Sequence, residues 1–185
     1  ISADGSIVAA LDETALRESL KTGMADDIQA LTICFINAYI NGEHERRARD
    51  IAQEFFPTIP ISISSEVVPE MQEYERTETT VVNSYVRPEV ARYVNNLQGA
   101  LNERLGDDTQ LSILRSDGGL ASSRAAAESP VNLLMSGPAG GVTGALFFCT
   151  KAGFSNILTF DMGGTSTDVA LIQNGRARVR RETFV

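Results

Sequence analysis

Two aspartates flank a turn rich in glycine and hydroxyl groups near the end of the sequence. An apolar run from Ile157 ends at Asp161, the turn 163–167 follows, and a second apolar run begins directly after Asp168. Glycine lets a backbone lie close to a bulky anion, and the N–H groups and hydroxyls of such a turn can serve as donors. The pattern predicts a strand, a phosphate-binding turn and a strand, with an ordinary glycine hairpin as the alternative.

The first aspartate is also a candidate for metal chemistry. A carboxylate does not bind phosphate, but Asp161 at the mouth of a strand can accept hydrogen bonds from the water shell of a divalent ion. The hairpin therefore suits a nucleotide that is bound together with magnesium.

A second candidate segment follows a strand predicted over residues 110–114. The segment is polar and contains Ser116, Asp117 and Gly118. In α/β sheets, ligands bind at the carboxyl ends of strands. We therefore expect a ligand contact here, and a plain loop is the alternative.

A third candidate segment is the start of a helix predicted at Ser136. Serine is a favourable cap, and Pro138 is tolerated in the first turn. Gly140 and Gly144 lie four residues apart, so one face of the helix is bare. That face can approach either a nucleotide or another backbone, and the positive end of the helix, with Gly137, favours an anion.

The first part of the sequence predicts a hairpin, a helix and the first strand of a sheet. An Asp-Gly pair predicts a hairpin over residues 2–10, and Asp12 is expected to cap a helix that runs to Lys21 and ends at Gly23. The apolar run 28–37 predicts a strand that is covered on both faces, as in a parallel sheet.

A helix capped by Asn41 separates this strand from a second one at residues 61–64. Strand, helix and strand in one sheet imply a right-handed crossover. The lone histidine is expected to pack or cap, with a catalytic role as the alternative. The face of the helix that is spaced for burial consists of His44, Ala48, Ile51, Ala52 and Phe55.

Residues 70–105 predict a long helical stretch, which Pro88 is expected to kink or split. A span of this length is suited to bridge two lobes. Further on, Asn174 and Gly175 predict a last hairpin. The second part of the long helix carries an apolar stripe for packing, formed by Val90, Val94, Leu97, Leu101 and Leu105.

Charge and composition argue against several classes of partner. The net charge of −8 and the pI near 4.7 disfavour nucleic acids and anionic membranes. No apolar run approaches the roughly 20 residues of a membrane span, and no secretory signal opens the chain, so we expect a cytoplasmic protein. The one basic cluster suits the solvent face of a strand, with a docking role as the alternative; it consists of Arg176, Arg178, Arg180 and Arg181.

Several familiar cofactor motifs are absent from the sequence. Cys34 and Cys149 each lie alone in an apolar run, so buried free thiols are expected rather than a zinc or iron–sulfur site. Neither the P-loop pattern nor the dinucleotide-binding glycine pattern occurs.

The hairpin of residues 157–172 resembles the phosphate loops of the actin, Hsp70 and sugar-kinase superfamily, and it is closer still to the hydantoinase A and 5-oxoprolinase family. Asp117 and Gly140 depart from the family pattern, which more often has asparagine and alanine there. The resemblance covers the chain from about residue 28 to its end. Four further segments resemble that family in the same order: residues 41–47, residues 73–77 running on to 83–86, residues 116–120 and residues 136–141.

The resemblance implies an α/β fold made of parts of two ribonuclease-H-like lobes. Residues 1–65 would end the first lobe, residues 66–108 would form bridging helices, and residues 109–185 would begin the second lobe. Family members carry a first phosphate hairpin that is not found upstream of residue 157, and the sequence begins at Ile1. We therefore expect a piece of a longer protein that neither binds ATP tightly nor turns it over by itself.

The activity implied by the resemblance is ATP-dependent hydrolysis of a cyclic amide such as hydantoin, N-methylhydantoin or 5-oxoproline. Phosphorylation of the amide oxygen converts it into a leaving group, and the protein contributes mainly positioning and charge stabilisation. The implied partner is a hydantoinase B-type subunit or domain. The alternatives are a subunit of an ATP-dependent ketone carboxylase, a nucleotide-driven switch without its own chemistry, and a sugar or acid kinase.

The resemblance also implies roles for individual residues, with ATP and Mg2+ as cofactors. Asp161 would hold the magnesium waters, and Asp168 would orient the attacking group or contact a second metal; both are the expected catalytic residues. The expected nucleotide contacts are Gly163, Gly164, Thr165, Ser166, Thr167, Ser136, Gly137, Gly140, Asp117 and Gly118.

Overall fold

The computed structural model describes residues 1–22 and 27–177, which form two compact units. Unit 1 comprises residues 1–100 and 127–131, and unit 2 comprises residues 101–126 and the described part of 132–185. Both units contain helices and strands, in agreement with the predicted α/β class.

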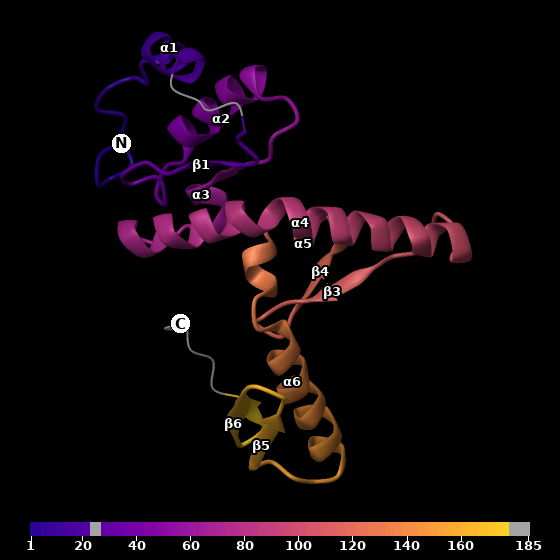
Figure 1. Ribbon diagram of the computed structural model, residues 1–185. Coiled ribbons are helices and arrows are strands. Elements are labelled where there is room, and N and C mark those ends of the chain that lie inside the picture. The colour runs from indigo at the N-terminus through magenta and orange to yellow at the C-terminus, as the bar shows by residue number, and fades with distance from the viewer. Residues whose placement is uncertain (23–26, 178–185) are drawn as a thin grey trace. The chain divides into compact units, whose positions relative to one another are not determined.

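Unit 1 is built around two short parallel strands. β1 (Leu31–Ile33) and β2 (Ile61–Ile63) pair in parallel, and α2 (Glu43–Phe55) connects them, so the predicted strand–helix–strand order is confirmed. α1 (Glu13–Thr22) packs against α2, as Figure 1 shows. The buried cluster of this unit consists of Leu20, Ile51, Ala52 and Ile61.

Two ion pairs join α1 to α2. Arg47 donates to both carboxylate oxygens of Glu13 at 2.7 and 2.6 Å, and Arg17 donates to both oxygens of Glu54 at 2.6 and 2.9 Å. These hydrogen bonds lower the pKa of Glu13 and the pKa of Glu54 below their ordinary value. All four side chains remain partly exposed, so water and salt screen the pairs.

The start of the chain differs from its prediction. Residues 2–10 form a turn at Gly5 (φ 85°) but no strands. The two β-branched residues of this segment, Ile7 and Val8, stay exposed, so no strand face is buried here. The predicted cap of α1 is confirmed, since Asp12 Oδ1 accepts a hydrogen bond from Ala15 N at 2.9 Å. Gly23 lies outside the described residues.

The predicted strand 28–37 is reduced to the three residues of β1, which are half-buried. Asn41 does not itself cap α2: the cap position is Gly42, while Asn41 Oδ1 accepts a hydrogen bond from Glu43 N at 3.0 Å. His44 is half-buried on the inner side of this helix, in line with a packing role. The fully buried members of the predicted face are Ala48, Ile51 and Ala52.

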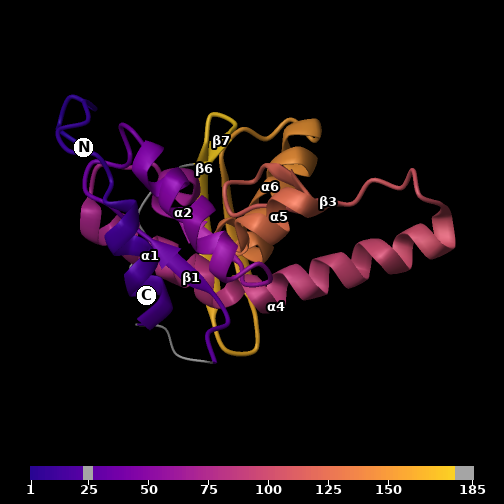
Figure 2. The same cartoon turned by 90° about the horizontal axis from the view of Figure 1, so that it is seen from above.

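α3 (Ser64–Val67) precedes α4 (Glu73–Leu105), which is one continuous helix with Pro88 inside it (Figure 2). The predicted apolar stripe is only partly used for packing: Val94 is buried, whereas Leu105 is 70% exposed. The first half of α4 instead buries polar side chains, namely Arg76, Thr80, Asn83 and Ser84.

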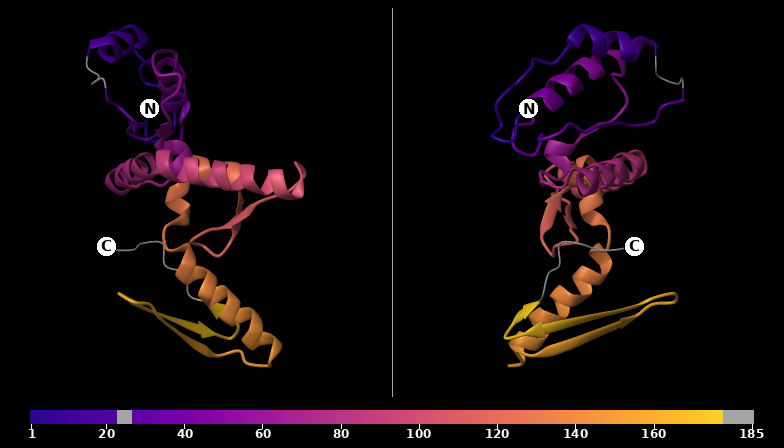
Figure 3. Two further views of the ribbon diagram at one scale, coloured as in Figure 1. Left: turned by 45° about the vertical axis from the view of Figure 1, so that its right-hand side comes forward. Right: turned by 90° about the vertical axis from the view of Figure 1, so that its left-hand side faces the viewer.

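Unit 2 places one helix alongside a β-hairpin. Figure 3 shows the hairpin running along the helix in both of its views. The elements along residues 112–177 are β3 (Ser112–Leu114), β4 (Leu120–Ser122), α5 (Ser123–Glu128), η1 (Pro130–Leu133), α6 (Ser136–Lys151), β5 (Ile157–Met162), β6 (Thr167–Gln173) and β7 (Arg176–Ala177). The end of α5 and the start of η1, within residues 127–131, belong to unit 1.

Two predictions for unit 2 need correction. The polar segment 115–119 is the turn between the antiparallel strands β3 and β4, so it does not follow a strand of a parallel sheet. The N-cap of α6 is Met135, in the left-handed region (φ 65°), and Ser136 is the first helical residue. The predicted Asn-Gly turn is confirmed, with φ of 52° at Asn174 and 71° at Gly175.

The remaining expectations concern single residues and membrane spans. Both cysteines are free and half-buried. Arg176 is exposed on β7, whereas the other three arginines of its cluster lie outside the described residues. Within residues 1–22 and 27–177, no helix combines the length and hydropathy that a membrane crossing requires.

Candidate functional site

The β5–β6 hairpin brings the two aspartates of the motif opposite each other. In the antiparallel register Asp161 pairs with Asp168, and Met162 pairs with Thr167. The four-residue turn 163–166 is closed by a hydrogen bond from Gly163 N to Ser166 O at 2.9 Å. The predicted order of strand, turn and strand is present, with Thr167 as the first residue of β6.

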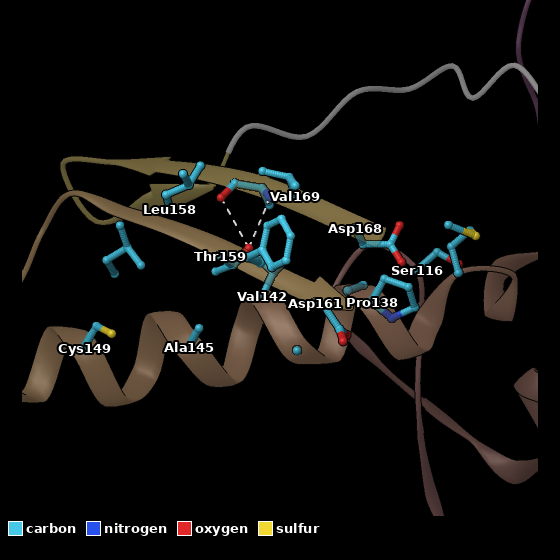
Figure 4. Close-up of a pocket in the computed structure, with 16 residues that line it drawn as sticks. Ser116, Pro138, Val142, Ala145, Cys149, Leu158, Thr159, Asp161, Asp168 and Val169 are labelled. Carbon is cyan, nitrogen blue, oxygen red and sulfur yellow. Dashed lines mark hydrogen bonds between the residues drawn. The ribbon is translucent and has the colours of Figure 1, made fainter. Parts of the chain in front are cut away.

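Alternation along the strands gives the hairpin two different faces. In Figure 4 the side chain of Asp161 points toward α6, whereas Leu158 points away from it. Leu158 and Phe160 are 66% and 62% exposed, so the outer face is apolar and open. Both aspartates share one strand face because their positions are register partners.

A groove of about 580 Å³ lies between α6 and the β5–β6 hairpin (Figure 4). Asp161 and Asp168 lie at one end of it, together with Ser116. The other end is lined mainly by small and aliphatic residues, so a ligand in the groove would meet charge at one end only. The lining residues of this second end include Val142, Ala145, Cys149 and Ile157.

The glycines of α6 allow two close approaches. A Cβ added at Gly141 would lie 3.6 Å from Asp161 Oδ2, so this glycine faces the carboxylate. A Cβ at Gly140 would lie only 2.5 Å from Leu114 Cδ2, so Gly140 allows close packing of α6 against β3. For the bare face of this helix, close packing against another part of the backbone was the alternative to a nucleotide contact. Neither Gly137 nor Gly144 has a neighbour within 4 Å of such a Cβ.

The turn between β3 and β4 contributes Ser116 to the groove. Ser116 N and Oγ both donate to Asn132 O, each at 2.8 Å, and Oγ also contacts the carbonyl of Leu134. Asp117 is engaged locally, because its carboxylate pairs with Arg115 Nη2 at 2.9 Å and accepts the hydrogen bond of Gly119 N at 2.9 Å. The turn is thus held by its own polar groups.

Gly118 packs directly on α6. Its φ of 81° lies in the left-handed region, and an added Cβ would lie 3.1 Å from Thr143 Oγ1. Any larger residue at this position would strain the turn and press on the helix.

The structure brings some of the predicted site residues together and leaves others apart. The predicted site residues that line the groove are Asp161 and Asp168, and Ser116 of the second candidate segment lines it as well. The remaining predicted contacts lie outside its lining: the turn residues Gly163, Gly164, Thr165 and Ser166, with Thr167, Asp117, Gly118, Ser136, Gly137 and Gly140.

Sequence reasoning missed three polar or small residues of the groove. Thr159 lies on the face of Asp161 by the period of two, and its hydroxyl bridges to Ala170 O and N at 3.3 and 3.2 Å. Gly141 directly follows a glycine that was considered. Cys149 lies eight residues further along α6, which places it on the same helix face. Strand and helix periodicity could have found all three.

A metal ion in this groove would meet two carboxylates. Among the described residues, no group of three or more His, Cys, Asp and Glu side chains could hold a metal. Magnesium is commonly held by one or two carboxylates together with water and substrate phosphates. Asp161 and Asp168 therefore suit magnesium that arrives with a nucleotide better than a cage made by protein alone.

The family-like segment 41–47 of unit 1 contributes a buried carboxylate to the fold. Glu45 is fully buried, and it accepts hydrogen bonds from Phe35 N and Ser65 N, both at 2.8 Å, and from Ser64 Oγ at 2.6 Å. Three donors offset the cost of burying this charge. Sequence reasoning placed Glu45 only in the first turn of its helix and did not foresee its burial.

The segment 73–77 supplies the matching cation. Arg76 is 1% exposed, and its Nε donates to Ser64 Oγ at 3.1 Å while Nη1 and Nη2 donate to Glu70 O and Phe35 O at 2.9 and 2.8 Å. Ser64 thus links the buried carboxylate of Glu45 to the buried guanidinium. These motif residues join α2, α3 and α4 within unit 1.

Comparison with known proteins connects both units to one family. Residues 76–185 match the family described as "Hydantoinase/oxoprolinase", and residues 1–56 match "Hydantoinase/oxoprolinase N-terminal region". Caprolactamase subunit alpha of Pseudomonas jessenii is 36% identical over 183 residues, which are 99% of this chain and 26% of the relative. The 5-oxoprolinase of Saccharomyces cerevisiae is 36% identical over 166 residues, which are 89% of this chain and 12% of the relative.

Solved structures agree with this assignment. The nucleotide-free structure of acetone carboxylase, from work on ATP-dependent acetone carboxylation, has a TM-score of 0.78 and 33% identity and covers 91% of this chain and 24% of that chain. The ATP-dependent caprolactamase of Pseudomonas jessenii has a TM-score of 0.75 and 34% identity over 92% of this chain and 25% of that one. The chain therefore spans about a quarter, or less, of the length of these relatives.

Proposed function

Because the chain belongs to the hydantoinase/oxoprolinase family, we propose that it is part of an ATP-dependent hydrolase of cyclic amides. The substrate class is a hydantoin, N-methylhydantoin or 5-oxoproline. The observation that carries the proposal is the groove in which Asp161 and Asp168 face the glycine-bearing side of α6. Relatives named for the opening of ring amides, an oxoprolinase and a caprolactamase, support the substrate class.

The proposal includes an architecture. Residues 1–65 end one ribonuclease-H-like lobe, residues 66–108 bridge, and residues 109–185 begin a second lobe with the phosphate hairpin. The continuous helix α4 and the β5–β6 hairpin support this division. Since the relatives are about four or more times longer, the whole site also requires parts of the protein outside this chain.

ATP with Mg2+ fits the residues that the structure provides. Gly164 has no atom within 4 Å of an added Cβ, so the turn 163–166 leaves open space beside its backbone. Asp161 and Asp168 would face the metal, and the backbone of Gly163, Gly164 and Thr165 would receive phosphate oxygens. Magnesium bound to the phosphates supplies charge neutralisation there.

The chemistry follows from the weakness of an amide as an electrophile. Transfer of a phosphoryl group to the ring amide oxygen reduces amide resonance, so that water can add to the carbon. The ring C–N bond then breaks, the nitrogen leaves as an amine, and a second water releases the phosphate. Asp161 would orient the metal-bound waters, and Asp168 would orient the attacking group.

A ketone carboxylase subunit is the second candidate. The specific observation in its favour is the TM-score of 0.78 to acetone carboxylase, against 0.75 to caprolactamase. Both classes would use ATP to activate an oxygen of the substrate, so the groove described above suits either one. The two candidates differ in the substrate that stimulates ATP consumption.

We propose a hydantoinase B-type subunit or domain as partner. One relative is named as a subunit, which supports an assembly. A nucleotide-driven switch without bond-breaking chemistry would need no such partner for turnover, and its ATP hydrolysis would not respond to small cyclic amides.

The test uses the full-length protein together with its partner. ADP, free phosphate and organic product are measured with hydantoin, 5-oxoproline or caprolactam, and separately with acetone plus bicarbonate. We expect a ring amide to stimulate ATP hydrolysis and to yield the ring-opened product with free phosphate. Stimulation by acetone alone would favour the carboxylase, a stable phosphorylated product would favour a kinase, and no response to any substrate would favour the switch.

A further inference from the structure

Gly141 of α6 is a glycine that alanine could replace without strain. Its backbone is helical, and a Cβ built on it would meet Asp161 Oδ2 at 3.6 Å, an ordinary van der Waals distance. Glycine weakens a helix interior relative to alanine. The position therefore departs from the local helix preference, and such departures are expected at functional sites.

The neighbouring glycines of α6 differ from Gly141 in what surrounds them. A Cβ at Gly140 would lie 2.5 Å from Leu114 Cδ2, so packing accounts for that glycine. Gly144 has no atom of the described residues within 4 Å of an added Cβ, and it lies outside the lining of the groove. Gly141 does line the groove. A side chain at position 141 would therefore occupy the space beside the carboxylate of Asp161.

That carboxylate is one of two that share a strand face. Asp161 and Asp168 are register partners, and in Figure 4 Asp161 points toward α6. Within residues 1–22 and 27–177, no group forms an ion pair or a hydrogen bond with either carboxylate. Like charges opposite each other destabilise a strand pair, so a cation at this end of the groove would offset the repulsion. Carboxylates and water are the ligands that magnesium prefers.

We propose that Gly141 belongs to the metal site of the groove and keeps the space beside Asp161 Oδ2 for a water molecule of a bound magnesium ion. A methyl group 3.6 Å from this oxygen would touch it and exclude water from that side of the carboxylate. Because magnesium gives up its water reluctantly, the loss of this space weakens binding of the hydrated ion. The inference rests on the proposed function, which supplies the magnesium nucleotide.

The experiment compares Gly141→Ala with Gly144→Ala in the full-length protein with its partner. Both variants add one methyl group to α6 and remove one glycine, so they gain the same helix preference. Binding of ADP is measured by calorimetry at a series of magnesium concentrations and in EDTA. Amide hydrogen exchange of residues 137–151 is measured without ligand.

We expect protection of the α6 amides to rise about 2- to 5-fold in both variants, because alanine favours the helix. The affinity for ADP in magnesium should fall about 10- to 100-fold in Gly141→Ala, as is typical when the surroundings of a metal's ligands are altered. Its affinity for ADP in EDTA should match that of the parent. Gly144→Ala should match the parent with and without magnesium.

Four results would overturn the inference. Parental magnesium dependence in Gly141→Ala would show that the methyl group displaces nothing. An equal loss of affinity in both variants would trace the effect to the stiffness of α6, and an equal loss in magnesium and in EDTA would place the contact on the nucleotide. Lower protection of α6 in Gly141→Ala than in the parent would show that alanine does not fit.

A parent protein that binds no ADP would refute the proposed function, and Mn2+ binding without nucleotide then decides the inference. Mn2+ takes oxygen ligands as Mg2+ does, and the water that it keeps is detected through the relaxation of water protons. Weaker Mn2+ binding in Gly141→Ala than in Gly144→Ala would support the assignment of Gly141 to the metal site. Equal affinities, or no binding by the parent, would refute it.

Discussion

Replacement of Glu45 by glutamine tests the buried polar centre of unit 1. The substitution keeps the shape of the side chain but turns one acceptor oxygen into an NH2 donor. With Oε1 retained for Phe35 N and Ser64 Oγ, the new NH2 group faces Ser65 N, which is itself a donor. The variant therefore loses one hydrogen bond to a charged group and buries two donors that oppose each other.

The magnitude follows from these contacts. A hydrogen bond to a charged group contributes about 1.5–3 kcal/mol, and an unsatisfied buried donor costs about 1–3 kcal/mol. The expected loss is at least about 2.5 kcal/mol of local stability, which corresponds to roughly two orders of magnitude in an equilibrium constant at 1.36 kcal/mol per decade. Such a loss is a large part of the stability of an ordinary domain.

Amide hydrogen exchange gives a local assay that does not require the whole protein to unfold in one step. The amides of Phe35 and Ser65 both donate to Glu45, so their protection should fall roughly 100-fold in Glu45→Gln. The matched control is Glu43→Gln, which makes the same charge change at an exposed position two residues earlier in α2. If both variants kept parental protection at these two amides, the role assigned to the buried carboxylate would be wrong.

Three further outcomes are expected. In the full-length protein, Asp161→Asn should lower ATP turnover about 10- to 100-fold at unchanged stability. Ile51→Val should instead leave turnover unaltered and lower the free energy of unfolding by only about 0.5–1.5 kcal/mol. Kinetics and urea unfolding measure both effects, and a larger loss of turnover in Ile51→Val than in Asp161→Asn would count against the site. Gly164→Val should weaken nucleotide binding in calorimetry without loss of melting temperature, because no atom lies within 4 Å of the added Cβ; parental affinity would argue against a phosphate contact. The hydrogen bond from Arg47 lowers the pKa of Glu13, so this pair stabilises α1 fully at pH values above 4.5, the ordinary pKa of the carboxyl group, and the stabilisation is lost as the pH falls through the lowered pKa. Amide exchange in α1 should therefore accelerate less on acidification in Glu13→Gln than in the parent.

Local pattern was sufficient for the parts of the fold whose geometry is set by neighbouring residues. The hairpin around Asp161 and Asp168 and the Asn174–Gly175 turn follow from alternation and turn chemistry, which act within a few residues. Asp12 was likewise recognisable as a cap because a cap bonds its own helix.

The buried side of α4 could not be predicted by the usual rule that polar faces are solvated. Arg76, Thr80 and Asn83 repeat at helical spacing. Arg76 and Asn83 are buried against partners outside α4, on α3, β2 and α5, whereas Thr80 donates to Arg76 O of its own helix. The opposite side exposes Tyr74 and Tyr85 at 74% and 84%. A polar stripe opposed to an aromatic one was the available signal, and only tertiary partners show which stripe is buried.

The groove shows the same limit. Period-two alternation places both aspartates on one strand face, but that this face meets α6 depends on packing between distant segments. Turn geometry also changed the role of Asp117, since its carboxylate is occupied by Arg115 and Gly119 in its own turn. Composition alone cannot tell a polar turn that binds a ligand from one that binds itself.

The contact between Gly140 and Leu114 has a consequence for sequence variation. The side chain of Leu114 occupies the space that a methyl group at position 140 would need, since the two would lie 2.5 Å apart. An alanine at position 140, the residue that the family pattern favours, would therefore select for a smaller or differently branched residue at position 114. Across homologues the two positions should covary, and the departure from the pattern at Gly140 is then one half of a compensated pair.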